Sequence, residues 1–287
     1  MTDTLSVTTV VPTRNRRTQL LTSLSHRRGP VIVVDNGSDD GSPESVASAF
    51  PAVRVVRLPE NLGAIARNIG VRLARTPYVA FTDDDAWWAP GALERAAELL
   101  EAHPDLALVA ARVLVGPERR LHPACAQLAG SGSDPSGADP GRLTVLAGAG
   151  RAVLGFTACG AVVRREAFLE VGGFRQLIDV AGEEERLALD LAAAGWQLAY
   201  VPTVVCHHHP VGHTDDRARR RRDVRDAVVT AVMRRPWQVV VRRVRSAASS
   251  LDGMLGLVDA LPRIPTAVLG RRMIPDHLEQ RCRMLGL

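Results

Sequence analysis

The first 115 residues alternate between short apolar runs and segments of helical periodicity, and this alternation limits the fold more than any other feature. Five runs rich in β-branched residues are bounded by turn residues and predict strands: VTTVV (7–11), PVIVVD (30–35), VRVVRL (53–58), YVAFTD (78–83) and LALVAARV (106–113). Helical patterns separate them at about 16–24, 42–50, 61–74 and 90–103. Strands connected by helices of this length form βαβ units, so we predict an α/β fold with a mostly parallel central sheet.

Polar side chains follow three of these runs, at the point where each predicted strand ends. They are Arg14-Asn15, Asp35-Asn36 and the triplet from Asp83 to Asp85. In parallel α/β sheets, ligands bind at the carboxyl ends of the strands. The three clusters are therefore expected to converge on one rim of the sheet and form a binding site.

The acidic triplet in FTDDDAWW follows directly on the apolar run YVAF. Adjacent carboxylates repel one another, and burying one without a partner is costly. We therefore expect a cation at this position. The alternative is a solvated acidic turn that caps the helix beginning near Pro90.

The remaining chain divides into three parts. Residues 116–150 include the turn-rich stretch GSGSDPSGADPG and predict a mobile loop or short hairpin. A strand and short helix follow in 155–174, then a helix over about 183–194 and the strand WQLAYVPTVVC (196–206). We predict a domain over 1–215 with two parts, 1–115 and 116–215. Residues 216–287 form an Arg-rich helical extension.

The charge is unevenly distributed along the chain. The net charge is +5, but the segment from Asp215 to Arg245 holds eleven Arg and four Asp, so the rest sums to −2. No run is long and apolar enough for a transmembrane helix, and the first residues lack the basic region of a signal peptide. Four widely spaced cysteines favour reduced thiols and a cytoplasmic protein.

Four blocks together resemble the family 2 glycosyltransferases, which have the GT-A fold. They are VVPTRNR (10–16), VIVVDNGSDDGS (31–42), NLGAIARNIG (61–70) and FTDDDAWWAPGAL (81–93). The resemblance implies a nucleotide-sugar-binding half at 1–115 and an acceptor and catalytic half at 116–215, and FTACG and GEEERLALDLAAAGW match the acceptor half more loosely. The resemblance implies a metal-dependent, inverting transfer of a sugar from a UDP- or dTDP-sugar donor to an acceptor hydroxyl on a cell-envelope glycan, glycolipid or secondary metabolite.

The resemblance also implies roles for residues of the donor site. Asp83 and Asp85 occupy the DxD position and would hold Mg²⁺ or Mn²⁺, which neutralises the leaving diphosphate. Three adjacent histidines end the last strand, and His207 by its family position would complete the metal shell; a neutral His near the nucleotide is the alternative. Further donor contacts are expected from Pro12, Thr13, Arg14, Asp35, Arg67 and Asp84. For Asp35, an Asx turn is the alternative to base binding.

The catalytic base is expected at the start of the helix over 183–194. By resemblance Glu184 deprotonates the acceptor hydroxyl and Glu183 supports it, although the family more often has Asp at the second position, which leaves the register open by one residue. Acids in a first turn are also favoured by the helix dipole alone. We place acceptor contacts at Trp87, Trp88, Cys159 and Gly160, with one tryptophan stacking on a sugar and the other in the core.

Two other functions fit parts of the chain. One is a nucleotidyltransferase, although no P-loop or GxGxxG is present. The other is a membrane- or nucleic-acid-binding protein acting through the Arg-rich tail; nucleic acid is not expected as a partner because the tail lacks interleaved aromatics. The helix beginning near Pro236 either packs on the transferase domain or lies on anionic membrane at the inner face.

Overall fold

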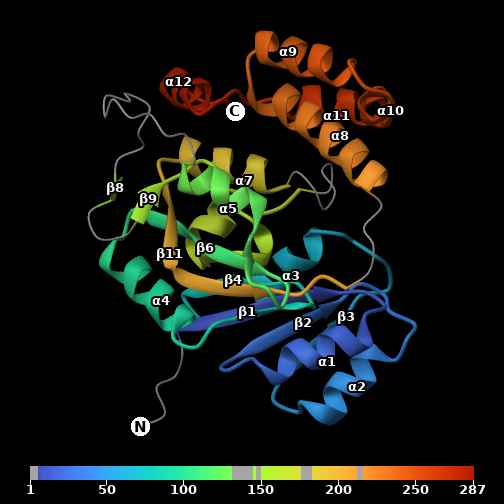
Figure 1. Cartoon of the computed structure of the whole chain (residues 1–287), viewed down its shortest axis with the longest axis vertical. Coiled ribbons are helices and arrows are strands. Elements are labelled where there is room, and N and C mark those ends of the chain that lie inside the picture. Colours follow the sequence, from blue (N-terminus) through green and yellow to red (C-terminus); the bar gives the residue numbers. More distant parts are fainter. Residues whose placement is uncertain (1–5, 131–144, 147–149, 176–182, 212–215) are drawn as a thin grey trace.

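The computed structural model describes residues 6–130, 145–146, 150–175, 183–211 and 216–287 (Figure 1). Most of the turn-rich stretch GSGSDPSGADPG lies outside these residues, so the predicted mobility of that stretch is not addressed by the structure. All four cysteines are described, and each is buried and free, which agrees with the expected reduced thiols.

One mixed sheet forms the centre of the molecule, with the order β3-β2-β1-β4-β10-β6-β11-β9-β8. Four strands at one side, β1 to β4, are parallel, as predicted from the βαβ pattern. β10 then runs antiparallel between β4 and β6, and β6 pairs in parallel with β11. The main strands are β1 (Val7–Thr13), β2 (Val31–Asp35), β3 (Arg54–Arg57), β4 (Tyr78–Phe81), β6 (Leu106–Val115), β10 (Ala161–Arg164) and β11 (Gln197–His208). The short strands are β5 (Ala86–Trp88), which pairs with β11, β7 (Arg120–Leu121), β8 (Val145–Leu146) and β9 (Gly150–Ala152).

Helices cover both faces of the parallel strands. On one face, Val11 and Val33 pack with Leu20 of α1 (Arg17–Ser25) and Val46 of α2 (Ser42–Ala49). On the other face, Val10 belongs to the main core together with α3 (Ile65–Leu73) and α4 (Ala92–Ala102). Strands buried on both faces explain why the runs in the sequence are continuously apolar instead of alternating.

Helix α3 approaches β1 closely because Gly70 has no side chain. A Cβ atom at this position would lie 2.3 Å from Cγ1 of Val10. Only glycine permits this contact without a shift of the helix. The close approach places Arg67, one turn earlier on α3, at the carboxyl edge of the sheet.

Residues 116–130, which follow β6, contain more secondary structure than the sequence predicts. β7 pairs with β6 as a hairpin, which agrees with one of the two predictions for this region. A helix that was not predicted, α5 (Pro123–Ala129), follows it. His122 caps α5 by accepting the Ala124 N–H, and Pro123 occupies the first turn, so local capping explains this helix.

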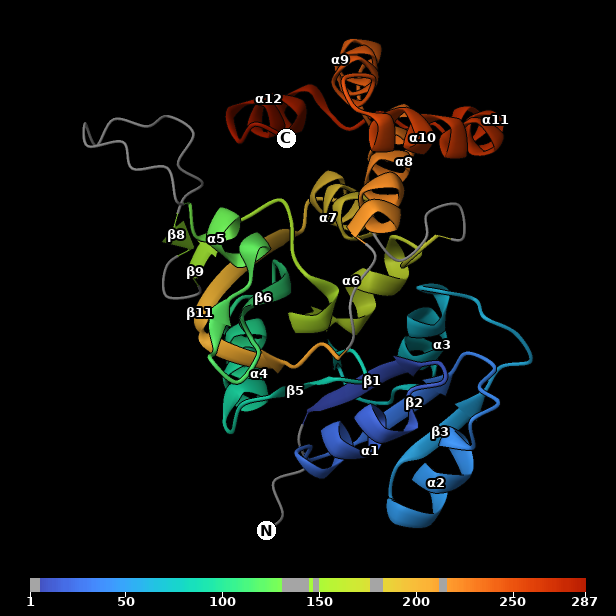
Figure 2. The same ribbon diagram turned by 45° about the vertical axis from the view of Figure 1, so that its right-hand side comes forward.

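The last 72 residues form a layer of helices at one end of the molecule, next to α7 (Glu183–Ala193), in both views (Figures 1 and 2). They are α8 (Asp216–Arg234), α9 (Trp237–Ala247), α10 (Leu251–Ala260), α11 (Ile264–Leu269) and α12 (Asp276–Met284). Val229, Val232 and Met233 of α8 form a small core with Val240 and Ala267. A second small core joins Leu278 and Cys282 of α12 to Leu189 of α7. The extension is therefore packed against the helix on which the catalytic base was predicted.

Candidate active site

Residues from three strand ends meet in an open cleft of about 310 Å³. Its lining comprises Pro12, Thr13, Arg14, Arg16, Asn36, Asn61, Gly63, Arg67, Asp83, Asp84, Asp85 and His208. The ends of β1, β2 and β4 all contribute, as expected for a parallel sheet. The predicted convergence of the polar clusters on one rim is therefore present in the structure.

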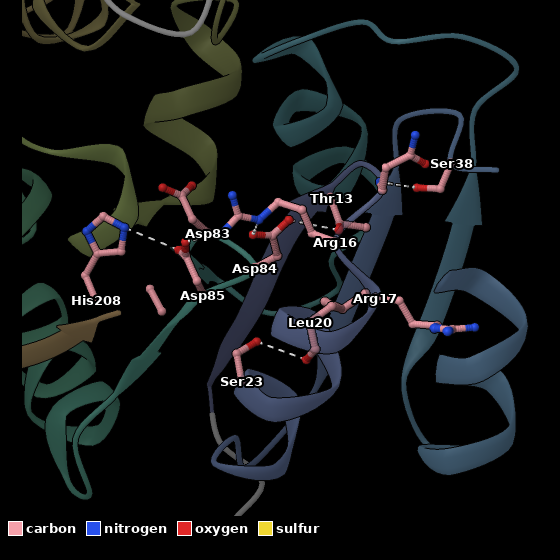
Figure 3. A network of polar contacts seen from close by, with 12 residues as sticks. Thr13, Arg16, Arg17, Leu20, Ser23, Ser38, Asp83, Asp84, Asp85 and His208 are labelled. Atoms are coloured by element: carbon pink, nitrogen blue, oxygen red, sulfur yellow. Dashed lines mark hydrogen bonds and ion pairs between the residues drawn. The ribbon is translucent and has the colours of Figure 1, made fainter. Parts of the chain in front are cut away.

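Two carboxylates of the acidic triplet and one histidine form a group with the composition of a metal site (Figure 3). Asp83, Asp85 and His208 each offer one ligand atom, and these atoms all lie within 4.8 Å of one another. The sequence analysis expected His207 at this position, and that expectation is wrong for the group seen here. Neighbouring side chains on a strand point to opposite faces, and it is His208 that faces the carboxylates.

The group has the chemistry to hold a divalent cation. Oδ1 of Asp85 is buried and lies 3.2 Å from Nε2 of His208, but it accepts no well-aligned hydrogen bond. Burial alone would lower the pKa of His208, but the adjacent Asp85 carboxylate outweighs burial and raises it. Carboxylate oxygens and one imidazole are ligands that Mg²⁺ and Mn²⁺ accept. The residues present therefore fit a divalent ion in this position.

Arg16, which follows β1, contacts both Asp84 and Asp85 of the triplet. Its Nε lies 2.8 Å from Oδ1 of Asp84, and its Nη2 lies 2.5 Å from Oδ2 of Asp85. Thr13 donates its hydroxyl to Oδ2 of Asp84 at 2.9 Å. Burial raises the pKa of Asp84 to about 7, although Arg16 and Thr13 act against it. Asp84 is therefore held by Arg16 and Thr13 at the end of β1, whereas Asp83 and Asp85 lie beside His208.

Arg27, at the end of α1, holds the backbone of the acidic turn. Its guanidinium donates to the hydroxyl of Thr82 at 2.5 Å and to the carbonyls of Asp83 and Ala86 at 2.9 and 2.6 Å. Burial lowers its pKa to about 10, so Arg27 stays charged at neutral pH. The sequence analysis assigned no role to Arg16 or Arg27. Arg16 lies inside the VVPTRNR block and could have been found there, whereas Arg27 has no local signal.

Arg67 connects the acidic turn after β4 to helix α7. Its Nη2 lies 2.7 Å from Oδ1 of Asp83, and its Nη1 lies 3.6 Å from Oε1 of Glu183. Burial would lower the pKa of Arg67, but the surrounding carboxylates outweigh it and raise that pKa. Arg67 is therefore a buried cation that holds carboxylates from β4 and α7 at one point.

The three consecutive glutamates at the start of α7 point in three directions, because successive residues on a helix are about 100° apart. Glu183 is buried and faces Arg67. Glu184 accepts the Ala158 N–H at 3.3 Å, next to the FTACG segment. Glu185 forms a bidentate ion pair with Arg243 of α9. Burial raises the pKa of Glu184, which is the direction expected for a general base.

Asp35 ends β2 and is 2% exposed. Its Oδ1 accepts the hydroxyl of Ser38 and its Oδ2 accepts the Ser38 N–H at 3.1 Å, which is the Asx-turn interaction. A nucleotide base would have to share or replace these bonds.

The residues predicted to bind the acceptor have little free surface in this structure. His26 and His209 stack on the Trp87 ring with centroids 4.4 and 4.6 Å away. A sugar could stack on this ring only by displacing an imidazole. Trp88 and Cys159 are buried in the main core, and a Cβ at Gly160 would lie 2.5 Å from Val113. These residues therefore offer little accessible surface to a ligand in this structure.

A larger cavity of about 630 Å³ lies away from these carboxylates, between α6 (Arg165–Glu170), α7 and the C-terminal helices. The ion pair of Asp190 with Arg234 lies in its wall. Because it lacks a group of convergent carboxylates, the smaller cleft is the better candidate for chemistry.

Residues 8–172 match the family model described as Glycosyl transferase family 2. Among curated proteins, an N-acetylglucosaminyl-diphospho-decaprenol L-rhamnosyltransferase of Mycobacterium tuberculosis is 27% identical over 248 residues, covering 75% of this chain and 78% of that protein. A pre-mycofactocin glycosyltransferase of the same species is 32% identical over 222 residues, covering 75% of this chain and 45% of that protein.

Solved structures share the fold at low sequence identity. The mannosyltransferase PcManGT from Pyrobaculum calidifontis, in complex with GDP-Man and Mn²⁺, has a TM-score of 0.59 and 23% identity, covering 98% of this chain and 86% of that one. TarS residues 1–349 of S. aureus, in complex with UDP, have a TM-score of 0.58 and 17% identity, covering 91% and 80%.

Proposed function

The chain belongs to glycosyl transferase family 2 and is a glycosyltransferase of the GT-A fold, and we propose that it inverts the anomeric configuration of the sugar that it transfers from a UDP- or dTDP-linked donor to a hydroxyl group. One observation carries the proposal. Asp83, Asp85 and His208 gather at the rim of the cleft, and Arg67 connects this group to the acidic start of α7. Donor and base would thus face each other across one cleft.

The donor diphosphate would lie at the group of Asp83, Asp85 and His208, with Mg²⁺ or Mn²⁺ held by these three side chains. When bound, the ion would offset the negative charge that develops on the leaving diphosphate. Arg16 and Arg14 line the same cleft and supply further positive charge. The Mn²⁺ in the PcManGT complex and the UDP in the TarS complex support this proposal.

Glu184 would accept the proton of the acceptor hydroxyl. The acceptor oxygen then forms a bond to the anomeric carbon, while the bond from that carbon to the diphosphate oxygen breaks and its electron pair leaves with the diphosphate. Glu183 is paired with Arg67, which makes it the supporting acid and leaves the proton to Glu184. A base of raised pKa suits proton abstraction near neutral pH.

The acceptor is proposed to be a cell-envelope or lipid-linked glycan. The rhamnosyltransferase relative is named for an N-acetylglucosaminyl-diphospho-decaprenol, which supports this class of acceptor. Such an acceptor would require the enzyme to work at the inner face of a membrane, on the cytoplasmic side. None of the helices that the structure describes is long and apolar enough to cross a bilayer.

We also propose that residues 1–215 form the transferase domain and 216–287 an extension that supports it. The described strands end at His208. Of the helices that follow, α12 packs on α7, and α8 and α9 are joined to α7 by the ion pairs of Arg234 with Asp190 and of Arg243 with Glu185. The nucleic-acid alternative has little support, because arginines of α8 are used inside the chain. Arg220 and Arg221 pair with Asp252 and Asp259 of α10.

Calorimetric titration of UDP, dTDP and GDP, with and without Mn²⁺, tests the donor site. We expect Mn²⁺-dependent binding of UDP or dTDP, and loss of that binding in Asp85→Ala. Asp276→Ala is the matched control, because this exposed carboxylate lies on α12. If none of the three nucleotides binds with Mn²⁺ present, the donor proposal is wrong.

A further inference from the structure

Helix α10 presents its large apolar side chains to solvent and its small residues to the protein. Gly253, Gly256 and Ala260 form the buried face. Leu251, Met254, Leu255 and Val258 follow the i, i+3, i+4, i+7 spacing of a single helix face, and all four are exposed. In a water-exposed helix the polar side chains normally occupy this outer face.

Close packing on α8 fixes this orientation. A Cβ at Gly256 would lie 2.7 Å from the carbonyl oxygen of Arg221 and 2.9 Å from Cβ of Val224. Asp252 and Asp259, the two acids of α10, turn toward α8 and pair with Arg220 and Arg221. Rotation of α10 would break both ion pairs and force side chains into α8. The outer face is therefore a stable property of the fold.

Exposed apolar side chains also occur in the segments that precede and follow α10 in the chain. We define the C-terminal apolar surface as the exposed residues Trp237, Val241, Val244, Leu251, Met254, Leu255, Val258, Leu261, Val268, Leu269 and Met273. Leu251, Leu261 and Leu269 are 66%, 64% and 88% exposed. Among the described residues, twelve of the fifteen exposed large hydrophobic side chains follow Pro236. Apolar exposure this concentrated marks an interaction site.

Arginines accompany this surface, whereas acids are turned away from it. Residues 216–287 contain 16 Arg and seven Asp or Glu, a balance of +9. Arg245 lies one turn from Val241 on α9, and Arg272 directly precedes Met273. Both are exposed, and neither forms an ion pair within the part of the chain that the structure describes. The surface is thus apolar with uncompensated positive charge beside it.

We propose that the C-terminal apolar surface binds the face of an anionic phospholipid bilayer, with α9, α10 and α11 lying in the plane of the interface. Exposed leucines and valines would enter the boundary between head groups and acyl chains, and Arg245 and Arg272 would contact lipid phosphates. The Arg271 guanidinium lies 4.4 Å from the centroid of the Trp237 ring. Tryptophan is an amphipathic residue that is typical of the head-group region of a membrane.

A second copy of the chain is a poorer occupant for this surface. A two-fold contact pairs the same patch with itself, so Arg245 and Arg272 of one copy would approach those of the other. The acids that could offset them, Asp252 and Asp259, are already paired with α8. An anionic bilayer supplies both the apolar interior and the negative charge that the surface lacks.

This inference deepens the proposed function, because it brings the cleft to a lipid-linked acceptor, but it does not depend on the donor chemistry. The full chain is tested by co-sedimentation with phosphatidylcholine vesicles that contain or lack phosphatidylglycerol. We expect binding to the anionic vesicles and at least tenfold weaker binding for the triple variant Leu251→Gln, Val258→Gln, Leu261→Gln. Because these side chains are exposed, the variant should keep its circular dichroism spectrum.

Two further variants test separately the position of the apolar side chains and the role of the arginines. Leu121→Gln with Leu169→Gln removes exposed apolar side chains outside the extension and should bind vesicles like the wild type. Arg245→Gln with Arg272→Gln should reduce the preference for anionic lipid.

Wild-type binding to neither vesicle, or equal binding by the triple variant, would overturn the proposal. The proposal would also be overturned if sedimentation velocity showed a dimer for the wild type and the control variants but not for the triple variant. Nucleotide titration of the same proteins keeps this test separate, because failure there leaves the vesicle result standing.

Discussion

Arg243 connects the extension to the helix that carries Glu184, and its replacement tests whether this connection supports catalysis. Its guanidinium nitrogens lie 3.1 and 2.7 Å from the carboxylate of Glu185, and Nη1 also donates to the carbonyl of Ala227 at 2.8 Å. The two side chains are 18% and 25% exposed. Exposed pairs contribute up to about 1 kcal/mol, and breaking a buried pair costs about 3–5 kcal/mol. For this intermediate case we expect Arg243→Met to lower the free energy of unfolding by about 2 kcal/mol.

Arg243→Met should lower kcat without changing the KM for the donor much. Because Glu185 adjoins Glu184, a shift at the start of α7 would misplace the base, and we expect kcat to fall roughly tenfold. The KM for the donor should change little, since Arg243 does not line the cleft.

Urea unfolding and initial-rate kinetics measure the two effects, with Arg222→Met, an exposed arginine of α8, as the control. A double-mutant cycle with Glu185→Gln isolates the pair. A coupling energy below about 0.5 kcal/mol, or an unchanged kcat with lowered stability, would refute the reasoning.

Three further predictions concern the site and the core. Glu184→Gln should lower kcat by about 10²- to 10⁴-fold, and the wild-type pH profile should lose activity below a pKa above the usual glutamate value, because burial raises it and only the carboxylate accepts a proton. His208→Ala should weaken Mn²⁺ binding in calorimetry at least about tenfold, while His207→Ala leaves it unchanged. Gly70→Ala should cost about 1–3 kcal/mol in urea unfolding, because its Cβ would meet Val10, and a neutral or stabilising result would contradict the close packing of α3.

Local patterns were sufficient to predict the parallel strands and their helices. The runs at 7–11 and 30–35 correspond to β1 and β2, because continuous burial leaves an apolar signature in the residues themselves. The run at 53–58 corresponds to β3, an edge strand whose residues are exposed or only partly buried. The antiparallel insertion of β10 was not predicted. Its pairing with β4 and β6 joins residues far apart in the chain, and nothing in Ala161–Arg164 specifies those partners.

The candidate site was predictable to the level of the cluster and not to the level of each atom. The alternation of β11 could not be counted from its start, because the pairing with β6 shifts register between Val201 and Val205. His207 was expected from its family position, and in the structure it is His208 that lies 3.2 Å from Asp85. Arg27 was missed for a different reason. It reaches the acidic turn from the end of α1, and only the packing of α1 on the sheet brings it there.

The position of β10 also determines how this chain can fold during synthesis. β4 and β6 both lie within the first 115 residues, but the strand between them is supplied by residues 161–164. A nascent chain that ends at residue 115 leaves the backbone edges of both strands unpaired, in a state open to wrong pairing. The sheet closes only after β10 has left the ribosome, and contacts of such long sequence separation form slowly. Residues 1–115 and the segment that supplies β10 are therefore expected to form one cooperative folding unit.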